Sequence, residues 1–301
     1  MLKISNHTRG FLITFIGVLV ITPDALLFRL VNTDLWTMAF LRGSLMPVGL
    51  FLIFLGYYRK RTLQLILNIG SAGIVVALLS LCSNMGFVTA LTYTTVAKTL
   101  IILACIPMFT GLFSWFFLKE KLNLAGILTL VVSFTGVCIV VGDNASSTAL
   151  NKGLVGDLAA LLTALCWAAI FTYLRRHKEV NMIPAIGLGW IALALVSLPF
   201  AQPFSLNTTQ LSAALLMGLI VLPVSFSLIA IGPRYLPAPE VSLLLLLETA
   251  LGPLWVWLVI HEQPGTNTLI GGTIVVISIA AYSVSQLVTM KRTVKLETSH
   301  S

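Results

Sequence analysis

The stretch TLIILACIPMFTGLFSWFFLKEKL, residues Thr99–Leu122, is apolar until it meets the charged triplet Lys119-Glu120-Lys121. A helix needs about 20 apolar residues to cross the hydrocarbon core of a bilayer, and this run supplies them. A second stretch of the same design, VSLLLLLETALGPLWVWLVIHEQP, occupies Val241–Pro264 and stops at His261-Glu262. The two stretches predict membrane-spanning helices, each with a polar stop at its end.

The composition places most of the chain in lipid. Of its 301 residues, 58% are hydrophobic and 9% are charged, and the mean hydropathy is +1.01. About a quarter of the residues of a soluble domain are charged, so this chain lacks the polar surface for water. The formal charge of +8 comes from short basic clusters beside apolar runs, which is typical of membrane topology signals. We therefore expect a lipid bilayer as partner and no nucleic acid.

The length of a spanning helix, applied to the whole chain, predicts an all-α membrane protein with ten helices joined by short loops. Four prolines, Pro47, Pro107, Pro223 and Pro253, fall inside these helices, and we expect kinks or packing notches there rather than breaks. The predicted helices are residues 10–30, 35–57, 66–91, 95–118, 122–141, 153–174, 182–201, 210–231, 239–260 and 267–288.

The basic residues orient the helices. A cytoplasmic amino terminus places fourteen Lys and Arg residues in inner loops and tails and leaves only Lys152 for the outer loops. This asymmetry satisfies the positive-inside rule, and an even number of helices returns the carboxyl terminus to the same side. We therefore expect both termini in the cytoplasm.

The chain also repeats itself. An offset of 142 residues pairs Glu120 with Glu262, and an offset of 146 pairs Gly10 with Gly156. The fourth and ninth helices are an odd number of helices apart, so the two halves cross the membrane in opposite senses. We expect two inverted repeats of five helices, 10–141 and 153–288, followed by a cytoplasmic tail, 289–301. Such repeats suit alternating access to a central site, although a duplicated scaffold would also explain them.

Three segments resemble a known family: GDLAALLTALCWAAIFTYLRR at Gly156–Arg176, the stretch Thr94–Val137, and LLLLLETALGPLWVWLVIHE of the ninth helix. They are similar to the paired EamA domains of the drug/metabolite transporter (DMT) superfamily, over nearly the whole chain. This resemblance implies a ten-helix transporter with inverted repeats in a bacterial inner membrane, often exporting amino acids or other small metabolites. The sequence departs from the family at Glu248-Thr249, where Glu-Pro is common, and this puts the local kink in doubt.

Two ionisable residues lie at a similar depth in the predicted outer half of the membrane. Asp24 stands about 20 Å into the first helix and Arg42 about 10 Å into the second from the opposite side. Each costs about 2.5 to 3.5 kcal/mol to insert, so each needs a reason to be there. The pair either holds the two helices together or forms a binding site in which Arg42 receives a substrate carboxylate.

Other candidates line the remaining helices. Glu248, near the midplane of the ninth helix, suits a proton-coupling site or a contact to a substrate amine, or else a hydrogen bond between helices. Lys98, at the start of the fourth helix, either extends to the membrane interface, which we favour, or attracts substrate. Trp167 and Trp190 lie deep enough to form the wall of a cavity, although each could equally face lipid.

These observations favour a secondary transporter. The sequence has no motif that supplies a catalytic nucleophile, metal or acid-base pair and no ATP-binding loop, so we expect neither an enzyme nor a cofactor nor ATP coupling. The four cysteines lie in apolar stretches and the histidines are scattered, so we expect no metal site. We expect alternating-access export of an amino acid or a related zwitterionic or anionic solute, with a proton or counter-solute as a possible partner. The alternatives are a membrane scaffold and an enzyme acting on lipid.

Overall fold

The computed structural model describes residues 6–58, 70–119, 150–263 and 265–278, together with short helical pieces between 128 and 139 and residue 281. Within this part of the chain the secondary structure is helical, without strands. Among the described residues, eight helices are long and apolar enough to cross a membrane. They are His7–Val31, Leu35–Ile53, Gly70–Tyr93, Val96–Leu118, Gly153–Arg176, Ile183–Phe200, Thr208–Tyr235 and Glu240–Ile260.

These eight spans coincide with eight of the ten predicted helices. The fifth predicted helix, 122–141, lies largely outside the described residues, as do the tail 289–301 and the basic cluster Arg59-Lys60-Arg61. The tenth, 267–288, is described only as a short apolar helix, Thr266–Ser278. The number ten therefore stays a prediction.

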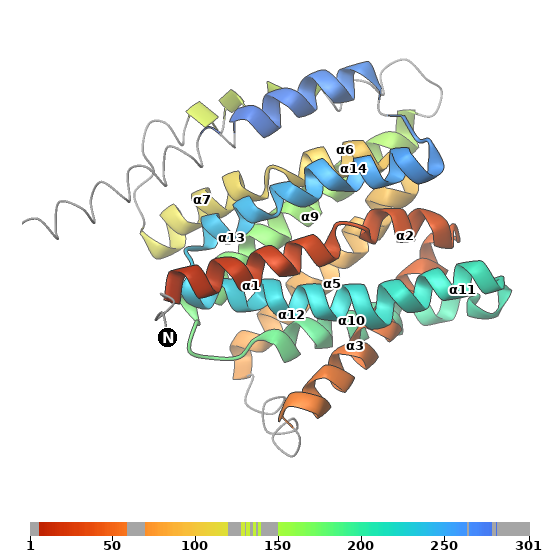
Figure 1. Ribbon diagram of the computed structural model, residues 1–301, viewed down its shortest axis with the longest axis horizontal. Coiled ribbons are helices and arrows are strands. Elements are labelled where there is room, and N and C mark those ends of the chain that lie inside the picture. Colours follow the sequence, from red (N-terminus) through yellow and green to blue (C-terminus); the bar gives the residue numbers. More distant parts are fainter. Residues whose placement is uncertain are drawn as a thin grey trace, which may run out of the picture.

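Three of the spans are interrupted. The first is divided into α1 (Asn6–Ile21) and α2 (Asp24–Val31), and the fourth into α6 (Val96–Leu103) and α7 (Ile106–Leu118). The eighth of these spans is divided into α13 (Ala238–Leu244) and α14 (Leu246–Ile260). Figure 1 shows that α1–α2 and α13–α14 run in the same direction, whereas α6–α7 runs the opposite way.

Prolines explain two of the interruptions. Pro23 precedes α2 and Pro107 stands in the first turn of α7, and neither has an N–H to continue the preceding helix. The prediction that prolines kink helices without ending them is therefore wrong for Pro107. At Pro47 and Pro253 the helix is not broken, since both prolines lie inside uninterrupted helices, α3 (Leu35–Tyr58) and α14.

The remaining spans are α5 (Gly70–Tyr93), α9 (Leu150–Arg176), α10 (Ile183–Ser197), and α11 (Thr208–Leu215) continuing into α12 (Leu222–Tyr235). A π-helical turn, η4 (Leu216–Val221), joins α11 to α12, and Pro223 follows it in the first turn of α12. Two short 3₁₀ turns, η2 (Leu198–Phe200) and η3 (Pro203–Ser205), lie between α10 and α11. π-Turns occur frequently at functional sites.

The core lies between helices from the two parts of the chain. The most extensive packing joins α5 to α9, α1 to α12 and α3 to α10, and each pair combines an early helix with a late one (Figure 1). Small residues allow this close approach, as is common between membrane helices. At Gly43 of α3, an added Cβ would lie 2.5 Å from the backbone nitrogen of Ala194 and 2.8 Å from the carbonyl oxygen of Trp190.

Candidate functional site

Asp24 and Arg42 form an ion pair inside the protein. Arg42 Nη1 donates to Asp24 Oδ1 at 2.8 Å and Nη2 donates to Oδ2 at 3.0 Å, so both oxygens and both terminal nitrogens are engaged. Each residue is 1% exposed. The interruption after α1 makes Asp24 the first residue of α2, where the positive end of the helix dipole favours a carboxylate.

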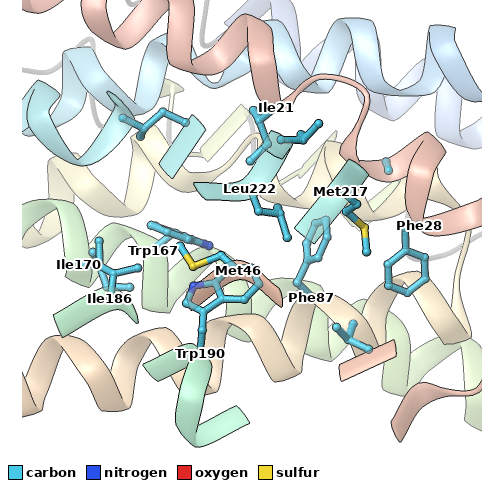
Figure 2. Packing of buried hydrophobic residues seen from close by; sticks show 14 of the residues in the cluster. Ile21, Phe28, Met46, Phe87, Trp167, Ile170, Ile186, Trp190, Met217 and Leu222 are labelled. Carbon is cyan, nitrogen blue, oxygen red and sulfur yellow. The ribbon is translucent and has the colours of Figure 1, made fainter. Parts of the chain in front are cut away.

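Aromatic rings and a sulfur atom surround the Arg42 guanidinium. Its central carbon lies 5.1 Å from the ring centroid of Phe87, 5.5 Å from Trp190 and 6.0 Å from Phe28. Met217 Sδ, in the π-turn η4, lies 3.3 Å from Nη1. Figure 2 shows Trp190, Phe87, Met217 and Phe28 grouped in this part of the core. These contacts hold the guanidinium in one place, although its buried Nε has no hydrogen-bond partner among the residues that the structure describes.

A small cavity of about 50 Å³ opens beside this pair. By volume it holds a few water molecules, since one water needs about 10–15 Å³ by this measure. Its wall includes Asp24 and Arg42 and a group of rings. The ring of Trp167 stacks on that of Phe226, with centroids 5.2 Å apart, and packs at a tilt of 33° against Phe171, with centroids 5.4 Å apart. The full lining is Ile21, Asp24, Arg42, Asn84, Phe87, Leu100, Leu103, Ile106, Trp167, Phe171, Phe226, Ile229, Leu245 and Glu248.

Glu248 is the third charged residue in the lining. It lies in the first turn of α14, directly after the interruption at Leu245, and its side chain is partly exposed to the cavity. In the part of the chain that the structure describes, its carboxylate makes no ion pair. The next residue, Thr249, continues α14 and donates its hydroxyl to the carbonyl oxygen of Leu100 at 3.2 Å. The helix is thus interrupted near Glu248 even without the proline that is common at position 249.

Four of the six predicted site residues line the one cavity: Asp24, Arg42, Glu248 and Trp167. Trp190 is fully buried behind Arg42 and touches Phe226, but it is not part of the lining. Lys98 is 6% exposed at the start of α6 and does not line the cavity. The favoured interpretation, that Lys98 extends to the membrane interface, does not fit this burial.

Several lining residues were not among the predicted site residues. Phe87, Phe171 and Phe226 form much of the aromatic wall, and Asn84 adds an amide whose Nδ2 donates to the carbonyl oxygen of Ser80. Asn84 had a signal in the sequence, because it is a polar residue well inside an apolar helix. The phenylalanines had no such signal, because the sequence does not distinguish a phenylalanine that faces a cavity from one that faces lipid.

Both ends of the bundle are tied together beside the cavity. At the rim where α1 begins, which we call the amino-terminal rim, His7 Nε2 lies 2.9 Å from Glu240 Oε2. At the opposite, distal rim, Arg29 Nε lies 3.1 Å from Glu262 Oε2, and Glu262 also accepts from the backbone N–H of Val96. The contacts of His7 with Glu240 and of Arg29 with Glu262 each join residues 233 apart. So does the contact of Trp255 with Thr22, which lies between them. The interrupted helices α1–α2 and α13–α14 therefore run parallel in constant register.

Comparison with known proteins identifies the family. The EamA-like transporter family matches residues 8–142 and 154–284. The chain is 27% identical over 209 residues to YoaV, an uncharacterized transporter of Bacillus subtilis strain 168, a match that covers 66% of this chain and 71% of the relative. An uncharacterized transporter of Clostridium kluyveri is 25% identical over 205 residues, covering 64% of this chain and 66% of the relative.

The fold is also found in a crystal structure of another protein. The two superpose with a TM-score of 0.70 over 92% of this chain and 98% of the other, at 17% sequence identity. At this identity the likeness concerns the fold alone. The family match covers nearly all of the eight apolar spans, and the chain therefore belongs to the EamA-like transporter family and is a multi-pass membrane protein.

Proposed function

We propose that this protein is a secondary transporter that exports an amino acid or a related zwitterionic or anionic solute through the cavity beside Asp24 and Arg42. The observation that carries the proposal is the cavity itself. It brings two acids, one base and an aromatic wall together from α2, α3, α9 and α14. Charged groups inside a membrane are costly, and their convergence on one cavity is typical of a substrate pathway.

In this proposal Arg42 binds the negative group of the solute. Its planar fork makes two hydrogen bonds to a carboxylate, as it now does to Asp24. A solute carboxylate therefore takes the place of Asp24 on Arg42, and Asp24 takes up a proton or turns toward the solute amine. Glu248, which shares the cavity, receives the amine or a coupling proton.

The proposed cycle is alternating access by two inverted repeats, 10–141 and 153–288, in a ten-helix protein. The interruptions support this idea. The offset of 142 residues places Leu103, the last residue of α6, on Leu245, where α13–α14 is interrupted. These two helices run in opposite directions, as inverted repeats require (Figure 1). Discontinuous helices of this kind form substrate sites in many transporters.

The present structure fits a closed step of that cycle. The cavity of about 50 Å³ has room for a few water molecules, and the contacts of His7 with Glu240 and of Arg29 with Glu262 tie the helices together at both rims. Transport then requires the contact at one rim, His7–Glu240 or Arg29–Glu262, to break and the cavity to widen. With the orientation expected from the basic residues, both termini are cytoplasmic in the inner membrane, and release at the distal rim is export.

Counterflow in liposomes tests the proposal. Purified protein is reconstituted and screened for uptake of labelled amino acids, organic acids and amines against the same unlabelled compounds. We expect counterflow with at least one class, and we expect Arg42→Ala to abolish it while the protein still inserts. Transport at the wild-type rate by Arg42→Ala would remove Arg42 from the mechanism. A panel without counterflow by folded protein would favour a scaffold, and turnover of lipid would favour an enzyme.

A further inference from the structure

We infer that Arg29 and Glu262 form the distal gate of the transport route, and that this gate opens when α2 and α14 move away from the turn between α5 and α6. The inference rests on the proposed transport function and says how its cavity opens at the distal rim.

The first argument is that the three interrupted spans meet at this pair. Arg29 lies in the last turn of α2, Glu262 is the second residue after α14, and Val96 is the first residue of α6. α2, α6 and α14 are the distal halves of their spans, whereas α1, α7 and α13 lie toward the amino-terminal rim (Figure 1). Each distal half also supplies a residue to the cavity wall, namely Asp24, Leu100 and Glu248. The same three half-helices therefore line the cavity and meet at the gate.

The second argument is the set of contacts that one carboxylate makes. Arg29 Nε lies 3.1 Å from Glu262 Oε2, and Arg29 Nη2 donates to Glu262 Oε1 at 3.5 Å. Glu262 Oε1 also accepts from the backbone N–H of Val96 at 3.1 Å, at the positive end of α6. Glu262 therefore joins the end of α14 to both α2 and α6.

The third argument is that the gate closes against a fixed part of the bundle. Arg29 Nη2 donates to the carbonyl oxygen of Thr94 at 2.9 Å, in the turn between α5 and α6. This turn packs tightly on α9, since a Cβ added to Gly156 would lie 3.1 Å from the backbone nitrogen of Thr94. α5 and α9 are uninterrupted, and their packing is the most extensive in the described structure. We therefore expect α5 and α9 to stay in place while α2 and α14 move.

The fourth argument is that the gate can break and form again in each cycle. The side chains of Arg29 and Glu262 are 25% and 24% exposed, and an ion pair that water reaches is weak. The interruptions before Asp24 and at Leu245 allow α2 and α14 to tilt without α1 and α13. Arg29 follows Asp24 by five residues, about 7.5 Å along α2, so a tilt that opens the gate also reaches the cavity.

Thiol labelling tests the gate. Leu103→Cys places a reporter in the cavity wall, and the full chain in lipid nanodiscs is treated with 2-(trimethylammonium)ethyl methanethiosulfonate, a charged reagent that does not cross lipid. Mass spectrometry measures the labelling rate at position 103. Arg29→Gln and Glu262→Gln should each raise this rate by about tenfold, the scale of one charged hydrogen bond.

Three controls separate opening of the gate from other effects. Native Cys166 is buried on α9 and does not line the cavity, so its labelling rate should stay unchanged if the fold is intact. A change in local charge alone would move the rate at position 103 in opposite directions in Arg29→Gln and Glu262→Gln, whereas opening raises it in both. Glu179→Gln, which changes an exposed acid after α9, should leave the rate unchanged.

Closing the gate covalently tests its role in transport. In Arg29→Cys/Glu262→Cys, a short bifunctional thiol reagent should stop counterflow, and a reductant that cleaves the link should restore it. The inference is overturned if neither neutral variant raises labelling at position 103, if Cys166 responds equally, or if counterflow continues in the cross-linked protein. Increased labelling in both neutral variants, with no counterflow by the wild type, would support the gate and contradict the proposed transport function, so the two failures can be told apart.

Discussion

Asp24 and Glu248 are two acids that line the same cavity from similar positions in their helices, yet they have different surroundings. Each lies in the first turn of a half-helix that begins after an interruption, and both line the same cavity. Asp24 is 1% exposed and uses both oxygens on Arg42, whereas Glu248 is partly exposed and makes no ion pair within the described residues. The position of an acid in its helix therefore does not decide whether it can bind a ligand. What decides this is whether a neighbouring helix supplies a partner for its carboxylate, as α3 supplies Arg42 for Asp24.

We therefore expect the two acids to have different roles, Asp24 a structural one and Glu248 one in binding or proton transfer. The Asp24–Arg42 pair joins α2 to α3 and fixes the guanidinium among three rings, which gives the cavity a rigid, neutral side. Glu248 gives the same cavity an acid that is open to a ligand or a proton. Replacing each acid or its partner, and measuring stability and transport, shows whether the two roles are separate.

The largest expected effect is on stability, from breaking the pair on one side only. Arg42→Met leaves Asp24 buried without its partner, and the free energy of unfolding should fall by about 3–5 kcal/mol. The double variant Asp24→Asn/Arg42→Met removes both charges and should recover most of this loss. The midpoint of thermal unfolding in detergent, followed by loss of the monodisperse peak in size-exclusion chromatography, measures both variants.

Glu248→Gln is the matched control for that experiment, because it neutralises a carboxyl that has no ion pair in the described structure. Its unfolding midpoint should stay near that of the wild type. If instead Glu248→Gln destabilises the protein as much as Arg42→Met, or if the double variant is no more stable than the single one, the contrast between the two acids is wrong.

Part of this contrast could be predicted from the sequence. Asp24, Arg42 and Glu248 stand out because charges are rare in a chain with 9% charged residues, and counting residues along helices placed Asp24 and Arg42 at a similar depth. The same counting gave the eight apolar spans that the structure contains. It could not decide whether Asp24 and Arg42 pair, because pairing depends on how the two helices face each other.

Other features have no signal in a single sequence. The interruption at Leu245 has no proline beside it, and the π-turn that positions Met217 packs against α3, which is far from it in the sequence. The ion pair of Arg29 with Glu262 joins residues 233 apart, so only the tertiary arrangement brings them together. Lys98 carries a charge that suggests an interface, yet the bundle buries it.

The second prediction concerns transport and tests whether Glu248 couples protons. Glu248 lines the same cavity as Asp24 and Arg42, and its carboxyl group makes no ion pair in the described residues, so it is available to take up and release a proton. Glu248→Gln should slow transport by about tenfold, the loss of one charged hydrogen bond of about 1.5 kcal/mol, and should flatten its dependence on pH. Uptake into liposomes buffered at a series of pH values measures both effects.

The control variant changes Glu179, an exposed acid that does not line the cavity. Glu179→Gln should keep both the wild-type rate and the wild-type pH profile. An unchanged pH profile in Glu248→Gln would exclude this carboxyl from proton coupling, and the coupling group would then have to be Asp24, freed from Arg42 during the cycle.

The smallest expected effect comes from a third acid, Asp34, which shows what an ordinary helix cap contributes. It precedes α3 between the first two spans, and its Oδ2 accepts from the backbone N–H of Thr37 at 3.0 Å. Burial raises the pKa of this carboxyl, but hydrogen bonds from Thr37 and the nearby backbone outweigh it, so the net pKa lies below the ordinary value of 3.8. Asp34→Ala should lower the free energy of unfolding by about 1 kcal/mol, the value of a typical cap.

The sign of the pH dependence separates the charge of Asp34 from its hydrogen bond. Because the pKa is lower in the folded protein, the ionised carboxylate stabilises the fold fully above pH 3.8 and loses this effect as the pH falls through the folded pKa. Asp34→Asn keeps a good cap but does not titrate, so the wild type should lose stability relative to Asp34→Asn only in that acid range. Unfolding midpoints of both proteins across that range measure the difference. A constant difference would mean that Asp34 acts through its hydrogen bond alone, and a difference already changing near neutral pH would place another titrating group beside α3.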